Sequence, residues 1–336
     1  MSLIFYYMLI LSTFFNCEAV DEIYVLDKGN AHIEYFGFTL IDTYWDDPTD
    51  AETKTNYADE IYQFSNLADI LVIKPDDSLV QRAQYFADLD LKAVLHLNEL
   101  FFELKGTDSP SGSSYDLRAD YLIRWHAFKH NNQAILNTDY IGAFYFGEEP
   151  TWNGITFAEL NTVAELLQTD FPDIPAMIIE AYPSINDLQV PETVDWVGFD
   201  QYFIKDPNSD PAFQHNWELL KSGLTSPQQK IMLILDSHYL AWAHGDYGGI
   251  DLLQMEEVAN NYHQLAISEK RVVGLLGYFW PNGFDFPESI GARGMPQNVK
   301  ANYERIGQEI TGKTNSVFTL QPPKSCFPIL KMLDIP

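Results

Sequence analysis

Residues 141–153 read IGAFYFGEEPTWN, an apolar run that ends in two adjacent glutamates. Glu148 and Glu149 close this run, and Pro150 and Trp152 follow at once. A run that is apolar throughout, rather than alternating, is typical of a parallel strand that is buried on both faces. The stretch therefore predicts a buried strand that presents paired carboxylates and an aromatic side chain at its carboxyl end.

Similar apolar runs recur along the chain, and segments with apolar residues at three- and four-residue spacing separate them. Eight strands are predicted at residues 35–41, 70–74, 92–97, 141–146, 176–179, 196–199, 231–235 and 273–279. Helices are predicted at residues 56–66, 79–87, 117–130, 157–170, 212–221, 252–268 and 298–311. The fifth connection, residues 181–193, is too short for a full helix.

Eight strand and helix units predict an α/β fold, a single (β/α)8 TIM barrel with right-handed crossovers. The barrel is expected to span residues 20–312, with a short C-terminal extension over residues 313–336. An open doubly wound sheet is the alternative. It is disfavoured because the first strand ends in the stretch TLIDTYWDD, and no glycine-rich phosphate loop follows it.

The first segment, residues 1–19, is expected to be a signal peptide, because residues 2–15 are almost wholly apolar and Ala19 suits cleavage. Lipid attachment at Cys17 and a buried N-terminal helix are alternatives. Export would make the protein secreted or periplasmic, or lipid-anchored at the cell surface. The segment is too short for a comfortable membrane span. Only Cys326 follows it, so no disulfide framework is expected.

The 336 residues carry 48 acidic and 20 basic side chains, a formal net charge of −28. This charge repels phosphate backbones, so nucleic acid is an unfavourable partner. A solvated acidic surface is one interpretation of this charge. The more specific interpretation is an acidic cleft that binds neutral or cationic sugars.

In barrels of this type the site lies at the C-terminal ends of the strands. Carboxylates and aromatic rings dominate those positions. Carboxylates can exchange protons with a glycosidic oxygen, and flat aromatic faces hold sugar rings, so the mixture fits glycoside hydrolysis. The candidate site residues are Asp42, Trp45, His96, Asn98, Glu99, Glu148, Glu149, Trp152, Glu180, Tyr182, Asp200, Tyr202, Asp236, His238 and Trp280.

The stretch FYFGEEP resembles the end of the fourth strand in clan A (β/α)8 glycoside hydrolases, where Asn-Glu-Pro or Asp-Glu-Pro presents the acid/base glutamate. Matched residue by residue, Glu149 takes the acid/base position and Glu148 replaces the preceding Asn or Asp. VDWVGFDQYF and GYFWPNG are also similar to such enzymes, and Trp280 in the latter resembles their platform tryptophan. The resemblance implies hydrolysis of an oligosaccharide or polysaccharide.

The chain departs from that pattern at the seventh strand. Clan A members usually carry a nucleophilic glutamate there, whereas LILDSHY offers Asp236. Asp236 is the predicted nucleophile or base, with Glu180 or Asp200 as alternatives. Carboxyl groups about 5 to 5.5 Å apart would indicate retention of configuration, and about 6.5 to 9.5 Å inversion.

Two other functions stay open at this point. Glu148 and Glu149, with help from Tyr202, could serve a substrate-assisted hexosaminidase mechanism, although Phe144 and Phe146 replace the Asp-rich chitinase signature. A catalytically silent carbohydrate-binding barrel would need the aromatic rings and not the acid.

Metal or cofactor chemistry is not expected. His96 and His238 could join a metal site with nearby acids, but the first strand has no His-x-His and no helix carries H-E-x-x-H. No G-x-S-x-G elbow indicates a serine hydrolase. The predicted partner is a carbohydrate substrate, with no metal and no cofactor.

Overall fold

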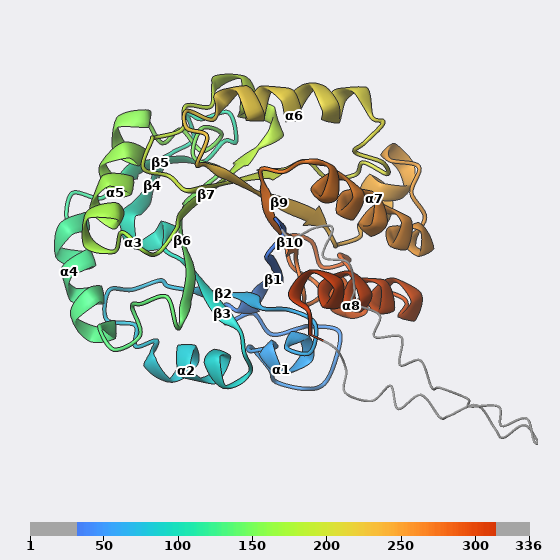
Figure 1. The fold of residues 1–336 in the computed structure, drawn as a ribbon, viewed down its shortest axis with the longest axis horizontal. Helices are drawn as coiled ribbons and strands as arrows, with labels where there is room; N and C mark the ends of the chain where they lie inside the picture. The colour runs from blue at the N-terminus through green and yellow to red at the C-terminus, as the bar shows by residue number, and fades with distance from the viewer. Residues whose placement is uncertain (1–31, 314–336) are drawn as a thin grey trace, which may run out of the picture. The chain divides into compact units, whose positions relative to one another are not determined.

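A closed barrel of eight parallel strands lies at the centre of the computed structural model, which describes residues 32–313 (Figure 1). The strands follow each other around the barrel in the order β1-β10-β9-β8-β7-β6-β3-β2, so β10 closes on β1. This confirms the predicted (β/α)8 barrel. The barrel strands are β1 (Tyr35–Asp42), β2 (Leu67–Leu71), β3 (Lys92–His96), β6 (Ile141–Glu148), β7 (Ala176–Ala181), β8 (Trp196–Asp200), β9 (Lys230–Asp236) and β10 (Val272–Tyr278).

Helices surround the strands, as Figure 1 shows for α2, α4, α5, α6, α7 and α8. The α-helices are α1 (Ala58–Ile61), α2 (Val80–Asp88), α3 (Asn98–Phe101), α4 (Tyr121–Asn132), α5 (Phe157–Asp170), α6 (Pro211–Gly223), α7 (Met255–Ser268) and α8 (Gln297–Thr311). Short 3-10 helices are η1 (Tyr182–Asp187), η3 (Leu252–Gln254) and η4 (Ala292–Gly294), and η2 (Ala241–Tyr247) is a π-helix.

Buried apolar side chains form two clusters. The smaller one draws only on barrel strands, with Val94, Met177 and Met232 among its members, so it fills the barrel interior. The larger one joins strand residues such as Phe144 to helix residues such as Trp125. Strands that are buried on both faces explain why their sequences are apolar throughout.

Two local predictions are confirmed. The helix predicted at residues 157–170 coincides with α5, and Thr156 caps its start: the Thr156 hydroxyl accepts the Glu159 N–H, and the Glu159 carboxylate accepts the Thr156 N–H. The short fifth connection holds only the 3-10 helix η1. One unit of the barrel therefore lacks its helix.

The second strand was placed wrongly. It occupies Leu67–Leu71, whereas the predicted range, residues 70–74, followed the apolar run ILVIK. The prediction excluded Asp69, a charged residue within the strand. Asp69 is buried there because its carboxylate accepts the N–H of Ile41 at 2.7 Å.

An antiparallel hairpin after the third barrel strand was not predicted. It consists of β4 (Phe102–Gly106) and β5 (Ser114–Leu117). The helix predicted from residue 117 starts only at Tyr121, because Leu117 pairs with Phe102 in the hairpin.

The predicted signal peptide, residues 1–19, and the tail beyond residue 313 lie outside the described residues. Between His32 and Lys313, no helix is both long and apolar enough to cross a membrane.

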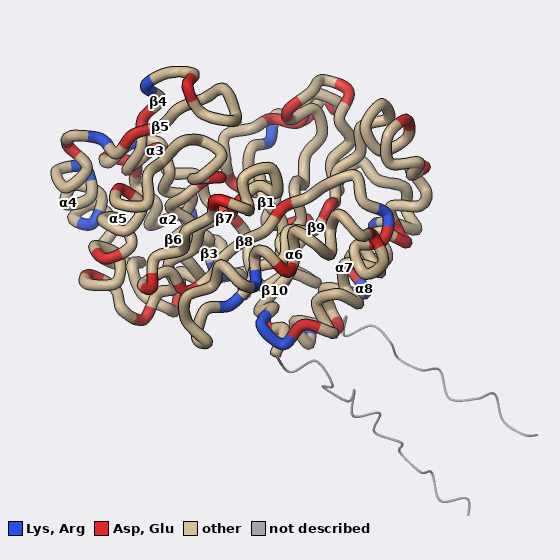
Figure 2. The backbone as a smooth tube through the Cα atoms, turned by 90° about the horizontal axis from the view of Figure 1, so that it is seen from above, with Lys and Arg blue, Asp and Glu red and all other residues tan. Residues whose placement is uncertain are grey.

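Acidic residues are spread over strands, helices and loops of the described chain (Figure 2). Arg293 pairs with Asp47, Asp50, Glu52 and Glu60. One guanidinium thus offsets part of the negative charge of four carboxylates. Arg293 does not line the cavity described below.

The close approach of β1 and β2 gives a first prediction. A Cβ atom on Gly37 would lie 1.9 Å from the carbonyl oxygen of Leu67, which is backbone and cannot move aside. We expect Gly37→Ala to lower the free energy of unfolding by about 3 kcal/mol or more, because overpacking displaces the strand. Chemical denaturation would measure the loss.

Gly106→Ala is the matched control, because nothing lies within 4 Å of its added Cβ. Its effect is expected to stay within about 0.5 kcal/mol. Equal stability of the two variants would contradict the close contact at Gly37.

Candidate active site

A cavity of about 640 Å³ opens at the C-terminal ends of the barrel strands. Carboxyl groups and aromatic rings dominate its lining, and none of the described residues that line it is Lys or Arg. The carboxyl groups are those of Asp69, Glu148, Glu149, Asp200 and Asp285. The aromatic rings include Tyr145, Trp152, Tyr182, Tyr202, Trp242, Tyr278, Phe284 and Phe286. The cavity is therefore electronegative and has flat apolar walls.

Glu148 and Glu149 line this same cavity although they are adjacent in sequence. Successive side chains of a regular strand point to opposite faces. Here β6 ends at Glu148, and Glu149 has a left-handed backbone with φ +44°. Its N–H donates to the carbonyl of Ile179 at 2.7 Å, and its carbonyl accepts the N–H of Asn153 at 2.8 Å. These bonds hold a conformation that costs a non-glycine residue on the order of 1–3 kcal/mol.

Glu148 is held as a carboxylate. The hydroxyl of Tyr145 donates to its Oε2, and Nε2 of His96 lies 3.3 Å from the same oxygen. Burial alone would raise the pKa of Glu148, but the hydrogen bonds and charge of His96 and the Tyr145 bond outweigh it and lower the pKa. The same contact raises the pKa of His96 against its own burial. Glu148 is the ionised member of the glutamate pair.

Glu149 is held as a neutral acid. Burial, together with the charges of Asp200, Glu148 and Glu180, raises its pKa to about 10. Its carboxyl group is hydrogen bonded to that of Asp200, whose pKa burial and neighbouring charges also raise well above its ordinary value. Two carboxyl groups in such contact share a proton, because both cannot ionise so close together. The pair retains a proton at neutral pH.

Glu180 has a positioning role. It is fully buried, and its carboxylate accepts the N–H groups of Thr151, Trp152 and Ala181 at 2.8, 3.3 and 3.1 Å. Thr151 and Trp152 follow Glu149 directly after Pro150, so Glu180 fixes the loop that carries the acid. It does not line the cavity.

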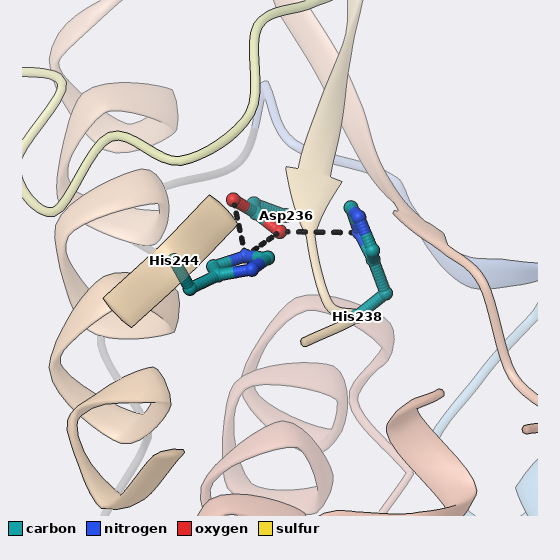
Figure 3. A group of neighbouring side chains, drawn as sticks. All are labelled: Asp236, His238 and His244. Carbon is teal, nitrogen blue, oxygen red and sulfur yellow. Dashed lines mark hydrogen bonds and ion pairs between the residues drawn. The ribbon is translucent and has the colours of Figure 1, made fainter. Parts of the chain in front are cut away.

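Asp236, the predicted nucleophile, is turned away from the cavity. It is fully buried, and its carboxylate accepts the N–H of Phe203 at 2.8 Å and contacts Nε2 of His244 at 3.1 and 3.2 Å. His238 lies on its other side, with Nδ1 3.3 Å from Oδ1 (Figure 3). Burial would raise the pKa of Asp236, but the charges and hydrogen bonds of the two histidines lower it. Its position argues against direct attack on a substrate in this cavity.

Asp236, His238 and His244 are also close enough to hold a metal ion, with ligand atoms within 4.8 Å of one another. The tautomer of His244 argues against this. The N–H of Leu240 donates to Nδ1 at 2.9 Å, closer than the Leu240 carbonyl at 3.3 Å, so a neutral ring carries its proton on Nε2. That Nε2–H donates to Asp236, and a protonated nitrogen is no metal ligand.

Two further predicted residues lie outside the cavity lining. Asp42 accepts the guanidinium of Arg82 at 2.6 Å, which neutralises it at the end of β1. Trp280 is buried against Phe38 with ring centroids 4.8 Å apart, and its Nε1 donates to Glu60 at 2.8 Å. Neither position supports the predicted contact with a sugar ring.

Trp45, Asn98 and Glu99 are likewise not among the lining residues. The Nε1 of Trp45 donates to a backbone carbonyl in the loop after β10 at 3.0 Å. Asn98 accepts the N–H of Glu148 at 3.3 Å, so it supports the catalytic candidate from behind. Glu99 lies 3.9 Å from the guanidinium of Arg118.

The remaining predicted residues do meet in the cavity. His96, Trp152, Tyr182, Tyr202 and His238 line it together with the glutamate pair and Asp200. Their strands are far apart in sequence, and the closed barrel brings their carboxyl ends to one edge.

Sequence reasoning missed Tyr145, Asp69, Tyr278 and Trp242 as lining residues. Tyr145 precedes the predicted strand end, and a register shift between β6 and β7 after it lets its hydroxyl reach Glu148. A tyrosine inside an otherwise apolar strand was the available signal. Trp242 lies on the π-helix η2, and the sequence of that segment has no regular spacing of apolar residues that would have predicted a helix.

No family model matches the sequence, and no curated protein matches it at a significant level. Among solved structures, a glucosidase from Croceicoccus marinus aligns over 82% of this chain and 66% of that chain, at 10% identity and a TM-score of 0.55. The chain thus spans just under two thirds of the length of that glucosidase. A GH113 β-1,4-mannanase aligns over 81% of this chain and 99% of its own, at 14% identity and a TM-score of 0.52.

A xylanase from Cellvibrio japonicus gives a similar alignment, over 84% of this chain and 99% of its own, at 9% identity and a TM-score of 0.52. The alignments with the mannanase and the xylanase extend over nearly the whole of those chains. The chain therefore has the (β/α)8 fold of these glycosidases, as its resemblance to clan A predicted. At such low identity the likeness concerns the fold.

The raised pKa of Glu149 gives a second prediction. The folded state keeps a proton that the unfolded chain, with an ordinary glutamate pKa of 4.5, releases. Between about pH 4.5 and pH 10 the folded state binds more protons, so stability falls as pH rises, by at most about 1.4 kcal/mol per pH unit for one group. Glu149→Gln removes this proton linkage. We expect its stability gain over wild type to grow from pH 5 to pH 9 in denaturant titrations.

Glu165→Gln, an exposed change on α5, is the control and should show the same pH dependence as wild type. A Glu149→Gln difference that stays constant with pH would mean that Glu149 has no raised pKa.

Proposed function

We propose that the protein is a glycoside hydrolase in which Glu149 protonates the glycosidic oxygen of the leaving group. The observation that supports this proposal most directly is that one cavity holds a neutral Glu149 and an ionised Glu148. Pairs of carboxyl groups whose surroundings push their pKa values apart are typical of acid and base assignments in glycosidases. The fold that the chain shares with glycosidases supports the same function.

Each group in the cavity has a distinct part in this proposal. Glu149 gives up the proton that it shares with Asp200 as the glycosidic bond breaks. The charge of Glu148, held by His96 and Tyr145, stabilises the positive charge that develops on the sugar ring. Loss of the proton is favoured at that moment, because the positive sugar ring offsets the crowding of negative charge.

The cavity lining favours neutral or cationic sugars. Five carboxyl groups line it, and no Lys or Arg among the described lining residues could pair with a uronate or sulfate. Trp152 and Tyr182 line it, and so do Trp242 and Phe286, whose ring centroids lie 5.5 Å apart. Aromatic faces of this kind hold the C–H faces of sugar rings. We propose a neutral or amino-sugar glycan as the substrate.

A catalytically silent carbohydrate-binding barrel is the second candidate. One observation favours it: the carboxylate at the end of β9, Asp236, is buried and bonded to other groups instead of facing the cavity. A binder needs the aromatic walls and the polar cavity, and it has no need of a second catalytic group.

Glu149→Gln separates the two candidates and is the third prediction. The amide keeps the shape of the side chain and cannot donate the proton to the leaving oxygen in the same way. We expect kcat on neutral and amino-sugar glycans to fall about 10²- to 10⁴-fold, with binding affinity within a few-fold of wild type. Reducing-end release and calorimetric titration measure the two quantities.

Glu165→Gln on α5 should retain full turnover. Binding without turnover by the wild-type protein over a broad glycan panel supports the silent binder. Unchanged turnover in Glu149→Gln would remove Glu149 from the role of donor.

A further inference from the structure

His238 follows the end of β9, and its ring lines the cavity, while Asp236 lies behind it. Its Nδ1 is buried and faces Oδ1 of Asp236 at 3.3 Å, the nearest polar contact recorded for this nitrogen in the described chain. This distance is longer than a well-formed hydrogen bond. Catalytic hydrogen bonds of unliganded enzymes are often long and tighten when substrate is bound.

The surroundings of Asp236 favour one proton position on His238. Asp236 already accepts the Phe203 N–H and the Nε2–H of His244, and both donors favour its ionised form. A carboxylate has only acceptor atoms, so a neutral His238 is stabilised when Nδ1 carries the proton. The other nitrogen, Nε2, then has a free lone pair. No described residue forms a hydrogen bond with it, and the cavity is the open space beside the ring.

Aromatic rings fix the orientation of His238. Phe279 stacks on it with centroids 5.3 Å apart, and Tyr202 and Tyr278 meet it edge-on at 5.1 and 5.5 Å. His238 is only 2% exposed, so its ring cannot rotate freely between alternative positions. Asp236 and these rings hold the imidazole in one orientation at the cavity wall.

Glu149 and His238 stand on different sides of the cavity. Glu149 follows β6 and His238 follows β9, and β7 and β8 separate these two strands in the barrel. Asp200 and Tyr202 lie between them: Asp200 is hydrogen bonded to Glu149, and the Tyr202 ring contacts His238. The acid and the imidazole therefore line the same cavity from strands that are not neighbours in the barrel.

We propose that His238, oriented by Asp236, is the base that activates water in the hydrolysis proposed above. Nε2 of His238 takes a proton from water as the water oxygen bonds to the anomeric carbon and the glycosidic C–O bond breaks. Glu149 gives its proton to the leaving oxygen. His238 ends protonated and Glu149 ionised, and proton exchange with solvent restores both. Attack by water on the face opposite the leaving group inverts the anomeric configuration. The proposal rests on the assignment of Glu149 as the acid.

The stereochemistry of the wild-type product is the first test. Proton NMR at early reaction times shows the anomeric configuration before the product mutarotates. Inversion is expected. Retention would overturn the role of His238 and leave the role of Glu149 intact, because retaining enzymes also need an acid. This measurement does not depend on the folding of any variant.

Substitution of the two groups separates acid from base. His238→Gln is expected to lower kcat about 10²- to 10⁴-fold on both a natural glycan and a dinitrophenyl glycoside. Glu149→Gln should lose turnover on the glycan and recover it on the dinitrophenyl glycoside, whose leaving group needs no protonation. His238→Gln activity within a few-fold of wild type overturns the inference alone. An inactive wild-type protein on every substrate removes the proposed function and this inference together.

Asp236 acts as a positioning residue and needs its own readout. In ¹⁵N NMR spectra the wild-type His238 ring should show a protonated Nδ1 and an unprotonated Nε2. Asp236→Asn should shift this tautomer balance and lower kcat with little change in KM. An unchanged His238 tautomer in Asp236→Asn would overturn the orienting role.

Discussion

Crowding of several carboxyl groups in one cavity determines the chemistry of this site. A buried charge is costly unless it is paired or hydrogen bonded, so neighbouring acids cannot all ionise. Glu148 remains ionised because His96 and Tyr145 bind it. Glu149 keeps a proton because of its burial and the charges of Asp200, Glu148 and Glu180. One physical constraint thus divides adjacent residues into an ionised group and a protonated one.

Backbone donors account for three other buried acids. Glu180 accepts three N–H groups, Asp69 accepts the N–H of Ile41, and Asp236 accepts the N–H of Phe203. In the described chain no backbone N–H donates to the carboxyl groups of Glu149 and Asp200. The backbone hydrogen bonds favour ionised carboxylates, and Glu149 and Asp200 lack them. This distinction separates Glu149 from Glu180 more clearly than their positions in the barrel.

Sequence periodicity predicted the barrel because its strands are buried on both faces and their apolar runs are unbroken. It misplaced β2, because the buried Asp69 depends on a bond to Ile41 that no local pattern reveals. The motif match selected Glu149, whose chemistry depends on burial and on neighbours from other strands. Asp236 was named for its place at the end of β9. Its orientation is set by His244 and Phe203, whose contacts with Asp236 exist only in the folded chain.

Backbone strain is concentrated around the same cavity. Leu40, Glu149, Phe203 and Asp285 all line it, and all have left-handed backbones with φ between +44° and +66°. Each such residue costs on the order of 1–3 kcal/mol and persists only where its surroundings enforce it. These residues lie within or after strands of a closed barrel with apolar packing on both faces, which supplies that enforcement. Relaxing Glu149 to an extended backbone would continue the alternation of β6 and turn its carboxyl group away from the side that Glu148 faces. The left-handed turn is therefore a condition for two adjacent glutamates to line one cavity.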